Sequence, residues 1–384
     1  MAERLGLQFA IIGLSIGWNG LAAVVRLLKL FKSGCFLFAV MLGSWAQAAT
    51  VDGLYEIRVP VVTQSEAERE EALKRALGGV LVRVTGNRLV EASPAGEKLV
   101  ALAGRFLRQY RYEPLPPGKT VENRQPAANQ LLYAKFDEPA VNEAIWKENL
   151  TVWGKTRPAL VVWLSVQELE SRVFIEDREA SVSAQAIKDQ ARSRGIPVVM
   201  PLMDAQDLAD LPIDDVWNES LDKIRHASAR YPAEAILAGH ISQAADGSWV
   251  ARFLFFLGDE PKSWDVSALD LSAVVNLGVD AAADEIAARY APAVGGGAAS
   301  ELVLRVSDVR TIDDYARTQR YLVSLPGVNS VQVLRVDAAR VVLRIALRAG
   351  KSAFEQAVAL GGQLLPDRVD GSDLPSSLVY RLRP

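Results

Sequence analysis

The chain has 384 residues, a formal net charge of −3 and hydrophobic side chains at 50% of its positions. The charge is +1 over residues 50–156, −10 over 157–292 and +3 over 300–384, and an acidic chain without basic clusters argues against nucleic acid as a partner. The single cysteine, Cys35, lies in the N-terminal segment, so the rest of the chain has no thiol for a disulfide, a metal site or a nucleophile.

The N-terminal segment carries the pattern of a bacterial signal peptide. Three basic residues precede an apolar run that is too short to cross a bilayer, because spanning requires roughly 20 residues. Small residues follow at the spacing that signal peptidase recognises. We therefore expect an exported, periplasmic protein that is cleaved after residue 48 or 49. The basic residues are Arg26, Lys29 and Lys32, the apolar run is Cys35–Gly43, and the small residues are Ala46, Ala48 and Ala49.

A second apolar segment, Leu5–Val25, precedes this signal and is long enough to span a membrane, although Asn19 and several glycines weaken it. Two interpretations follow. Either the true start lies near residues 24–27 and residues 1–49 are a signal region, or both segments are retained and anchor the protein in the inner membrane. We favour the first, because the chain from Arg26 onward is a complete signal peptide. Membrane contact is expected only through an uncleaved N-terminus.

Residues 50–156 are predicted to form a first α/β domain. Leu54–Val59 alternates like a strand, and Ser65 with Glu68 has the spacing of a capping box before a helix. Gly78-Gly79 leaves two alternatives: the helix breaks and Val80–Thr85 becomes a strand, or another part of the chain packs very closely there. Further predicted elements are a helix at Glu97–Arg108, strands at Tyr110–Leu115 and Gln130–Phe136, and a helix at Pro139–Leu150.

Three arginines in this region, Arg105, Arg108 and Arg111, could form an anion-binding patch. A solvated helix face and loop explains them more simply, and we favour that interpretation.

Residues 157–292 are predicted to form a second α/β domain with a mixed sheet. The near-continuous apolar run Ala159–Ser165 is typical of a strand buried on both faces. Asp246-Gly247 predicts a hairpin turn within a meander of three antiparallel strands, which resembles in topology the small α/β domains of exported adaptor proteins. The other predicted elements are helices at Ser183–Arg194, Asp215–Ala229 and Asp270–Tyr290, a short strand at Ile196–Met200, and meander strands at Ala233–Ser242, Trp249–Leu257 and Ser263–Leu269.

An acidic cluster lies in this second region. A calcium loop would need alternating oxygen ligands, a glycine at the turn and a final bidentate Glu, whereas this stretch has spacing of three and a proline. Helix N-terminal charge preference accounts better for Asp204, Asp214 and Asp215, so no metal site is expected. The cluster is Asp204, Asp207, Asp210, Asp214 and Asp215.

Residues 293–300 are predicted to be a flexible linker, and residues 301–384 a third domain. The predicted order is β-α-β-β-α-β, the ferredoxin-like split unit, with its last strand at Leu378–Leu382. The turn Leu325–Val328 is similar to that of heavy-metal-associated domains, but Ser307–Arg310 replaces their Cys-x-x-Cys, which excludes copper binding of that type. The other elements are strands at Leu302–Val306, Val331–Val336 and Val341–Leu347, and helices at Thr311–Ser324 and Ser352–Gly361.

Four segments resemble an exported family of Gram-negative bacteria, the domain of unknown function 2066. The resemblance extends over nearly all of residues 50–384. It implies export and this architecture, and it brings no activity. The segments are Gly53–Val61, Glu70–Leu77 with Val82–Gly86, Leu237–His240 and Leu360–Leu365.

No sequence motif points to catalysis, so we expect no catalytic, cofactor-binding or metal-binding residues and no cofactor. His226 and His240 lack the spacing of zinc ligands, and G-x-S-x-G, P-loop and G-x-G-x-x-G motifs are absent. We therefore expect a periplasmic adaptor or accessory protein of the cell envelope that binds other envelope proteins. The alternative is a metal-independent hydrolase of envelope material, with His240 near its site.

Overall fold

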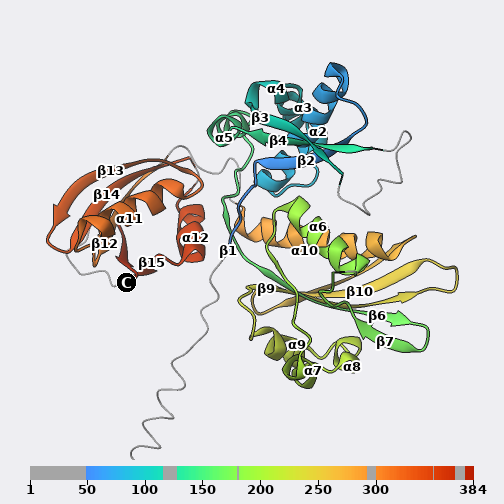
Figure 1. The fold of residues 1–384 in the computed structure, drawn as a ribbon. Coiled ribbons are helices and arrows are strands. Elements are labelled where there is room, and N and C mark those ends of the chain that lie inside the picture. The colour runs from blue at the N-terminus through green and yellow to red at the C-terminus, as the bar shows by residue number, and fades with distance from the viewer. Residues whose placement is uncertain (1–48, 116–127, 180, 292–299, 349, 368–376) are drawn as a thin grey trace, which may run out of the picture. The chain divides into compact units, whose positions relative to one another are not determined.

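The computed structural model describes residues 49–115, 128–179, 181–291, 300–348, 350–367 and 377–384. The predicted signal, the apolar segment Leu5–Val25 and most of the linker at 293–300 lie outside these residues. The described chain has a mixed α/β fold with three main sheets (Figure 1). Within it, no helix combines the length and apolar content needed to cross a bilayer.

The first sheet is antiparallel, with strand order β2-β4-β3. Helix α2, Glu66–Thr85, packs its buried side chains against this sheet. It begins at Ser65, whose Oγ accepts a hydrogen bond from the Glu68 amide. The Glu68 carboxylate accepts instead from the amides of Val62 and Thr63, so the predicted box caps in one direction only. The strands are β2 at Glu56–Val61, β3 at Leu107–Pro114 and β4 at Gln130–Phe136.

Helix α2 continues through Gly78-Gly79, because other parts of the chain approach its backbone there. A Cβ on Gly78 would lie 2.5 Å from the Glu91 carboxyl carbon, and one on Gly79 would lie 2.5 Å from Cδ1 of Ile57. The close-packing alternative is therefore confirmed, and the alternative strand at Val80–Thr85 is wrong.

The predicted helix at Glu97–Arg108 is wrong in its limits. The chain instead forms helix α3, Pro94–Ala101, and helix α4, Ala103–Phe106, before β3 begins. Ser93 caps α3 and Pro94 occupies its first turn, which starts the helix early. Pairing with β4 holds the chain extended from Leu107 onward. A short 3₁₀ helix at Val90–Ala92 precedes α3, and helix α5, Glu138–Lys147, follows β4.

The second sheet has strand order β11-β10-β9-β6-β7, with β8 also paired to β6. β6 is parallel to β9 and β8, and β9, β10 and β11 form the predicted antiparallel meander. The first predicted strand is confirmed as β6, whose first seven residues are all buried. The strands are β6 at Leu160–Glu168, β7 at Ser171–Phe174, β8 at Val198–Val199, β9 at Ala235–Gln243, β10 at Trp249–Phe256 and β11 at Pro261–Ala268.

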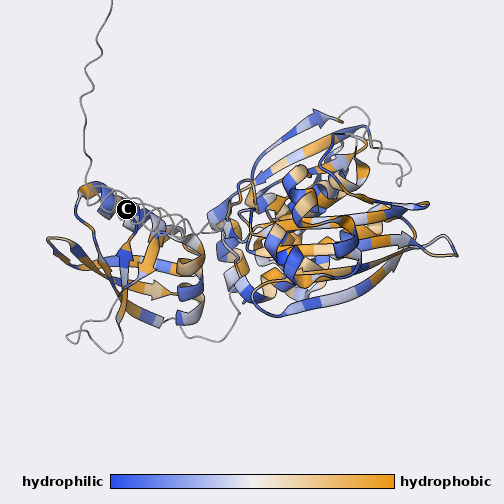
Figure 2. Ribbon diagram, turned by 90° about the horizontal axis from the view of Figure 1, so that it is seen from below, coloured by the Kyte–Doolittle hydropathy of each residue, from blue (hydrophilic) through white to orange (hydrophobic). Residues whose placement is uncertain are grey.

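Helices cover both faces of this second sheet (Figure 1). Helix α6, Val182–Arg194, and helix α10, Leu271–Tyr290, lie on one face. Three short helices lie on the other, and their buried hydrophobic residues pack against those of the strands. Hydrophobic positions occur along both the strands and the helices (Figure 2). The short helices are α7 at Ala205–Asp210, α8 at Ile213–Trp217 and α9 at Leu221–Ser228.

Three features of the second region differ from the prediction. Helix α7 was not predicted. The helix predicted at Asp215–Ala229 is divided into α8 and α9, because Glu219 has a left-handed φ of 53° that an α-helix cannot contain. Strand β7 was not predicted. It forms a hairpin with the end of β6 through Leu169, which also has a positive φ.

The third sheet has strand order β13-β14-β12-β16-β15. The predicted series β-α-β-β-α-β is present, but an unpredicted short strand, β15, adds a seventh element. The last strand, β16, lies between β12 and β15 and runs parallel to β12, so the sheet departs from the ferredoxin-like arrangement at this edge. The elements are β12 at Ser300–Ser307, α11 at Ile312–Ser324, β13 at Val328–Asp337, β14 at Arg340–Leu347, α12 at Lys351–Gly361, β15 at Leu364–Pro366 and β16 at Ser377–Leu382.

A small ladder connects the first two regions. Strand β1, Ala49–Thr50, pairs with strand β5, Thr156–Arg157. The ends of helices α2 and α6 come together beside this ladder, and their meeting positions the candidate site.

Candidate functional site

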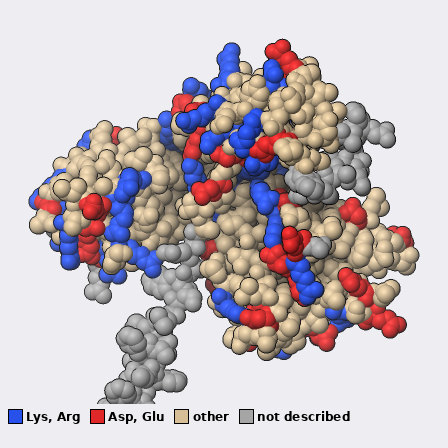
Figure 3. Space-filling model, viewed as in Figure 1, with Lys and Arg blue, Asp and Glu red and all other residues tan. Residues whose placement is uncertain are grey.

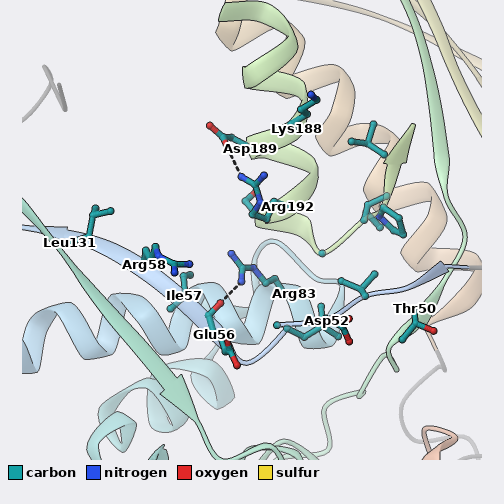
Figure 4. Close-up of a pocket in the computed structure, with 18 of the residues that line it drawn as sticks. Thr50, Asp52, Glu56, Ile57, Arg58, Arg83, Leu131, Lys188, Asp189 and Arg192 are labelled. Carbon is teal, nitrogen blue, oxygen red and sulfur yellow. Dashed lines mark hydrogen bonds and ion pairs between the residues drawn. The ribbon is translucent and has the colours of Figure 1, made fainter. Parts of the chain in front are cut away.

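A cleft of about 950 Å³ opens between β2 and the C-terminal half of α6 (Figure 4). Its apolar wall includes Leu54, Ile57 and Val198. Lys and Arg side chains extend along the hollow between these parts in the space-filling view (Figure 3). Four basic side chains line the cleft: Arg58, Arg83, Lys188 and Arg192.

Three of these four cations contact a carboxylate. The Nε of Arg58 lies 2.7 Å from the Glu113 carboxylate, and Lys188 contacts Asp177. Arg192 pairs with Asp189 on its own helix. Arg83 differs, because no carboxylate contacts it among the described residues. Of the four basic residues that line the cleft, Arg83 is therefore the one that forms no ion pair within the described chain.

Arg83 extends from the last turn of α2 and is partly buried. Its Nη1 donates a 2.7 Å hydrogen bond to the carbonyl oxygen of Glu56, while its buried Nε has no partner within the described residues. Burial and the positive charge of Arg192 lower the pKa of Arg83 to about 10. The guanidinium stays charged at neutral pH, at the expense of stability. A bound anion would offset both burial and the repulsion by Arg192.

The same arginines restrict what can bind to β2. β2 is an edge strand of its sheet, and an open edge is a template for another strand. Arg83 covers the carbonyl of Glu56, and Nη2 of Arg75 covers the carbonyl of Pro60 at 3.2 Å. Pro60 also lacks an amide hydrogen. The cleft therefore offers guanidinium groups and apolar side chains, together with the acidic residues Asp52, Glu56 and Asp189, rather than a free strand edge.

Arg157 fixes the two walls of the cleft relative to each other. It is fully buried, stacks 4.1 Å above the ring of Trp153, and donates only to backbone carbonyls. Some of those carbonyls belong to the ends of α2 and α6, where helix dipoles concentrate negative partial charge. The acceptors are the carbonyls of Arg83 at 2.7 Å, Gly195 at 2.9 Å, Gly154 at 3.0 Å, Trp153 at 3.1 Å and Arg194 at 3.4 Å.

Arg194 reinforces the same junction. It is 3% exposed, and its Nη2 donates to the carbonyl of Gly86, the C-cap of α2, at 3.0 Å. Its guanidinium also pairs with Asp280 at 2.8 Å and Asp284 at 2.6 Å, both on α10. Helices α2, α6 and α10 are thus joined by hydrogen bonds behind the cleft, and we expect a rigid site.

The two histidines lie away from the cleft. His226 on α9 is 74% exposed, and its Nε2 lies 4.0 Å from the Asp210 carboxylate. His240 on β9 stacks on Trp217 with ring centroids 4.6 Å apart, and its Nδ1 is buried without a partner in the described chain. Burial lowers the pKa of His240 below its ordinary 6.5, against the nearby Glu219. The structure does not bring the two histidines together.

The acidic cluster is tied up in local ion pairs. Asp204 and Asp207 both contact Arg230, and hydrogen bonding from Arg230 lowers the pKa of Asp204. The other members face Arg172, Lys223 and His226. Within the described ranges, no group of three or more His, Cys, Asp or Glu side chains could hold a metal ion.

The predicted arginine patch is not assembled around one ligand position. Arg105, Arg108 and Arg111 are exposed on α4 and β3. Arg111 contacts Glu113 and lies 3.6 Å from the ring centroid of Tyr133. These contacts agree with the solvated interpretation.

Sequence reasoning missed Arg83, Arg157 and Arg192 as site residues. One signal was present for Arg83, because it interrupts the apolar run Val80–Thr85, and a buried charge requires a partner. No local signal places Arg192 opposite Arg83, since the two residues come from helices far apart in the sequence.

The model of a family described as a domain of unknown function, DUF8605, matches residues 48–154. The matched segment contains β2 and α2, and therefore the Arg83 wall of the cleft. The match agrees with membership of an uncharacterised family, but family number 2066 is not the one matched. No curated protein matches the chain.

Proposed function

We propose that this protein is an adaptor or accessory protein of the cell envelope that acts by binding other envelope proteins, and that the cleft holds an anionic group of the bound partner. One observation carries the proposal: Arg83 is a partly buried cation that opens on a cleft and has no carboxylate partner among the described residues. A guanidinium presents a fork of donors that matches carboxylate or phosphate geometry.

The rest of the proposal comes from the sequence. Export to the periplasm of a Gram-negative bacterium is supported by the basic, apolar and small-residue pattern of residues 26–49. The resemblance to the domain of unknown function 2066 points the same way. N-terminal sequencing of the periplasmic fraction should give Ala49 or Thr50, whereas inner-membrane protein that retains residues 1–49 would contradict cleavage.

The domain division is proposed on the same basis. Residues 50–156, 157–292 and 301–384 would be three units. The main sheets follow this division except at Ser300, the first residue of β12, and Trp153 of the first span packs into the core of the second sheet. Residues 293–300 would link the last two. Because α2, α6 and α10 are tied together by Arg157 and Arg194, we expect the first two units to move as one body.

The test is affinity capture from an envelope fraction with the wild-type protein and Arg83→Gln. Glutamine keeps a donor but removes the charge that the partner's anion would pair with. We expect the Arg83→Gln protein to remain folded, because it no longer buries a charge, and to lose the partners that the wild type retains. Mass spectrometry identifies those partners.

Arg310→Gln is the matched control, because Arg310 is 72% exposed and pairs with Asp308 in another part of the chain. It should capture the same partners as the wild type. An unchanged partner set for Arg83→Gln would remove the cleft from the proposal. A folded His240→Gln protein that captures its partners but loses function in vivo would favour the hydrolase instead.

A further inference from the structure

The β13 edge of the third sheet is open. β13 has ten residues and, among the strands that the structure describes, pairs with β14 alone (Figure 1). Over the described chain, residues 330–336 make no backbone hydrogen bond outside the β13–β14 ladder. Half of the amide and carbonyl groups of this stretch therefore face outward without a protein partner. Such an edge can pair with an extended segment.

One side of this edge is apolar. Val333 and Val336 align with Leu343 and Val341, which are buried beneath the helices of this sheet. The two valines themselves are 42% and 65% exposed. Helix α11 packs against β13 and carries another exposed apolar residue, Val323, at 59%. An added strand would cover Val333 and Val336, which no described segment covers.

The opposite side of the edge is basic. Along β14, residues at odd positions are buried and Arg340 and Arg344 are exposed, so these arginines lie on the face away from the helices. Arg335 of β13 aligns with Val342 on that same face and is 73% exposed. Only two carboxylates pair with these three arginines among the described residues: Asp337 with Arg335, and Glu301 at 3.7 Å from Arg344.

We propose that β13 takes up an extended segment of a partner protein as an added strand, in which apolar side chains alternate with acidic ones. Successive side chains of a strand point to opposite faces. A register shift between Val333 and Arg335 returns Val336 to the face of Val333 and leaves Arg335 on the other face. The apolar side chains would lie beside Val333 and Val336, and the acidic ones beside Arg335, with Arg344 one strand further in on the same face. Main-chain hydrogen bonds to β13 would supply affinity, and the two faces would supply specificity.

A second copy of the chain fits this edge less well. Pairing β13 with itself would bring two arginine-bearing faces together, and like charges on neighbouring strands are destabilising. The charge on this face therefore favours an acidic segment. This inference deepens the proposed binding function but uses a surface separate from the cleft, so each can fail without the other.

The test uses a short labelled peptide in which valine alternates with glutamate, and a second peptide with lysine in place of glutamate. We expect the full protein to bind the glutamate peptide saturably in a fluorescence polarisation assay, and the lysine peptide more weakly. Amide hydrogen exchange should slow in β13 on binding, because strand addition protects the outward amides.

Charge reversal then tests the role of the arginine face. Arg335→Glu should weaken the glutamate peptide about threefold to fivefold, as for loss of one exposed ion pair, and should strengthen the lysine peptide. Arg310→Glu is the matched control, since Arg310 is equally exposed but lies before α11, and it should change neither affinity. Arg335 is a surface residue, so both variants should fold.

Four results would overturn the proposal. The first is no saturable binding of the glutamate peptide. The second is binding without slower exchange in β13, and the third is binding that Arg335→Glu leaves unchanged. The fourth is a concentration-dependent dimer that protects β13 without peptide, which would assign the edge to a second copy.

Discussion

Replacement of Arg157 by methionine should destabilise the protein strongly. The side chain is fully buried and donates to five backbone carbonyl oxygens, four of them at 3.1 Å or less. Methionine has a similar length but no donor. The carbonyls cannot be removed with the arginine, so they would stay buried without partners, and this distinguishes the site from ion pairs that apolar residues can replace.

The magnitude follows from the four short hydrogen bonds. At about 1 kcal/mol net for each, their loss costs about 4 kcal/mol. The apolar methionine side chain regains about 1 kcal/mol by burial, which leaves about 3 kcal/mol. For a cooperative unit of this size, that corresponds to a fall of roughly 6–12 °C in melting temperature. Arg157→Lys keeps the charge but loses the planar fork of donors. Its melting temperature should lie between those of the wild type and Arg157→Met.

The assay is thermal and urea unfolding followed by tryptophan fluorescence, which also reports on Trp153 beneath the guanidinium. The control is Arg178→Met, because Arg178 is 74% exposed and pairs only with Glu176. Its loss should cost about 0–1 kcal/mol. If Arg157→Met melts at the same temperature as Arg178→Met, the carbonyls at the ends of α2 and α6 do not need the guanidinium, and the reasoning is wrong.

Three further predictions concern other parts of the fold. Gly239→Ala should destabilise by about 1–3 kcal/mol, because its Cβ would lie 2.6 Å from the carbonyl oxygen of Arg252, whereas Gly104→Ala meets nothing within 4 Å and should melt like the wild type. His240 has a pKa below its ordinary 6.5, so the folded state resists its protonation. The stability of the wild type should therefore fall relative to that of His240→Gln as the pH drops below about 6.5. Urea midpoints of the two proteins that change in parallel with pH would contradict this. A fragment that begins near Ala298 should melt cooperatively, and a molten fragment would show that residues 301–384 need the preceding region as part of their core.

Strongly periodic segments could be predicted from the sequence. The run Ala159–Ser165 has the composition of a strand buried on both faces, and Asp246-Gly247 marks the hairpin between β9 and β10. The helix predicted at Ser183–Arg194 is α6, which ends at Gly195 in the left-handed conformation. In each case the local sequence and the tertiary environment favour the same structure, so local reasoning is sufficient.

The remaining features depend on distant contacts. Gly78-Gly79 lowers helix propensity, and only the approach of Glu91 and Ile57 decides that α2 continues. β16 lies between β12 and β15 in the third sheet, and the hydrophobic pattern of a strand does not determine which strands become its neighbours. The cleft is of the same kind, since Arg83 and Arg192 meet only after two helices have packed. The sequence pattern predicts the helix and strand that form the walls of the cleft, but the cleft itself exists only after these elements have packed together.

The three arginines of the α2–α6 junction differ in how many of their donors are used, and this difference separates structural from binding roles. A guanidinium carries five N–H donors on three nitrogens. Arg157 uses all three nitrogens on carbonyls, and Arg194 uses two on a carbonyl and two carboxylates. Arg83 uses one, on a single carbonyl. Arg157 and Arg194 are therefore neutralised or solvated by the fold itself, whereas Arg83 carries a positive charge that the described chain neither pairs nor fully solvates.

A protein that only needed to join α2 to α6 would gain stability by replacing Arg83 with an apolar residue. The charge at this position is therefore better explained by an anion that enters the cleft than by the stability of the junction.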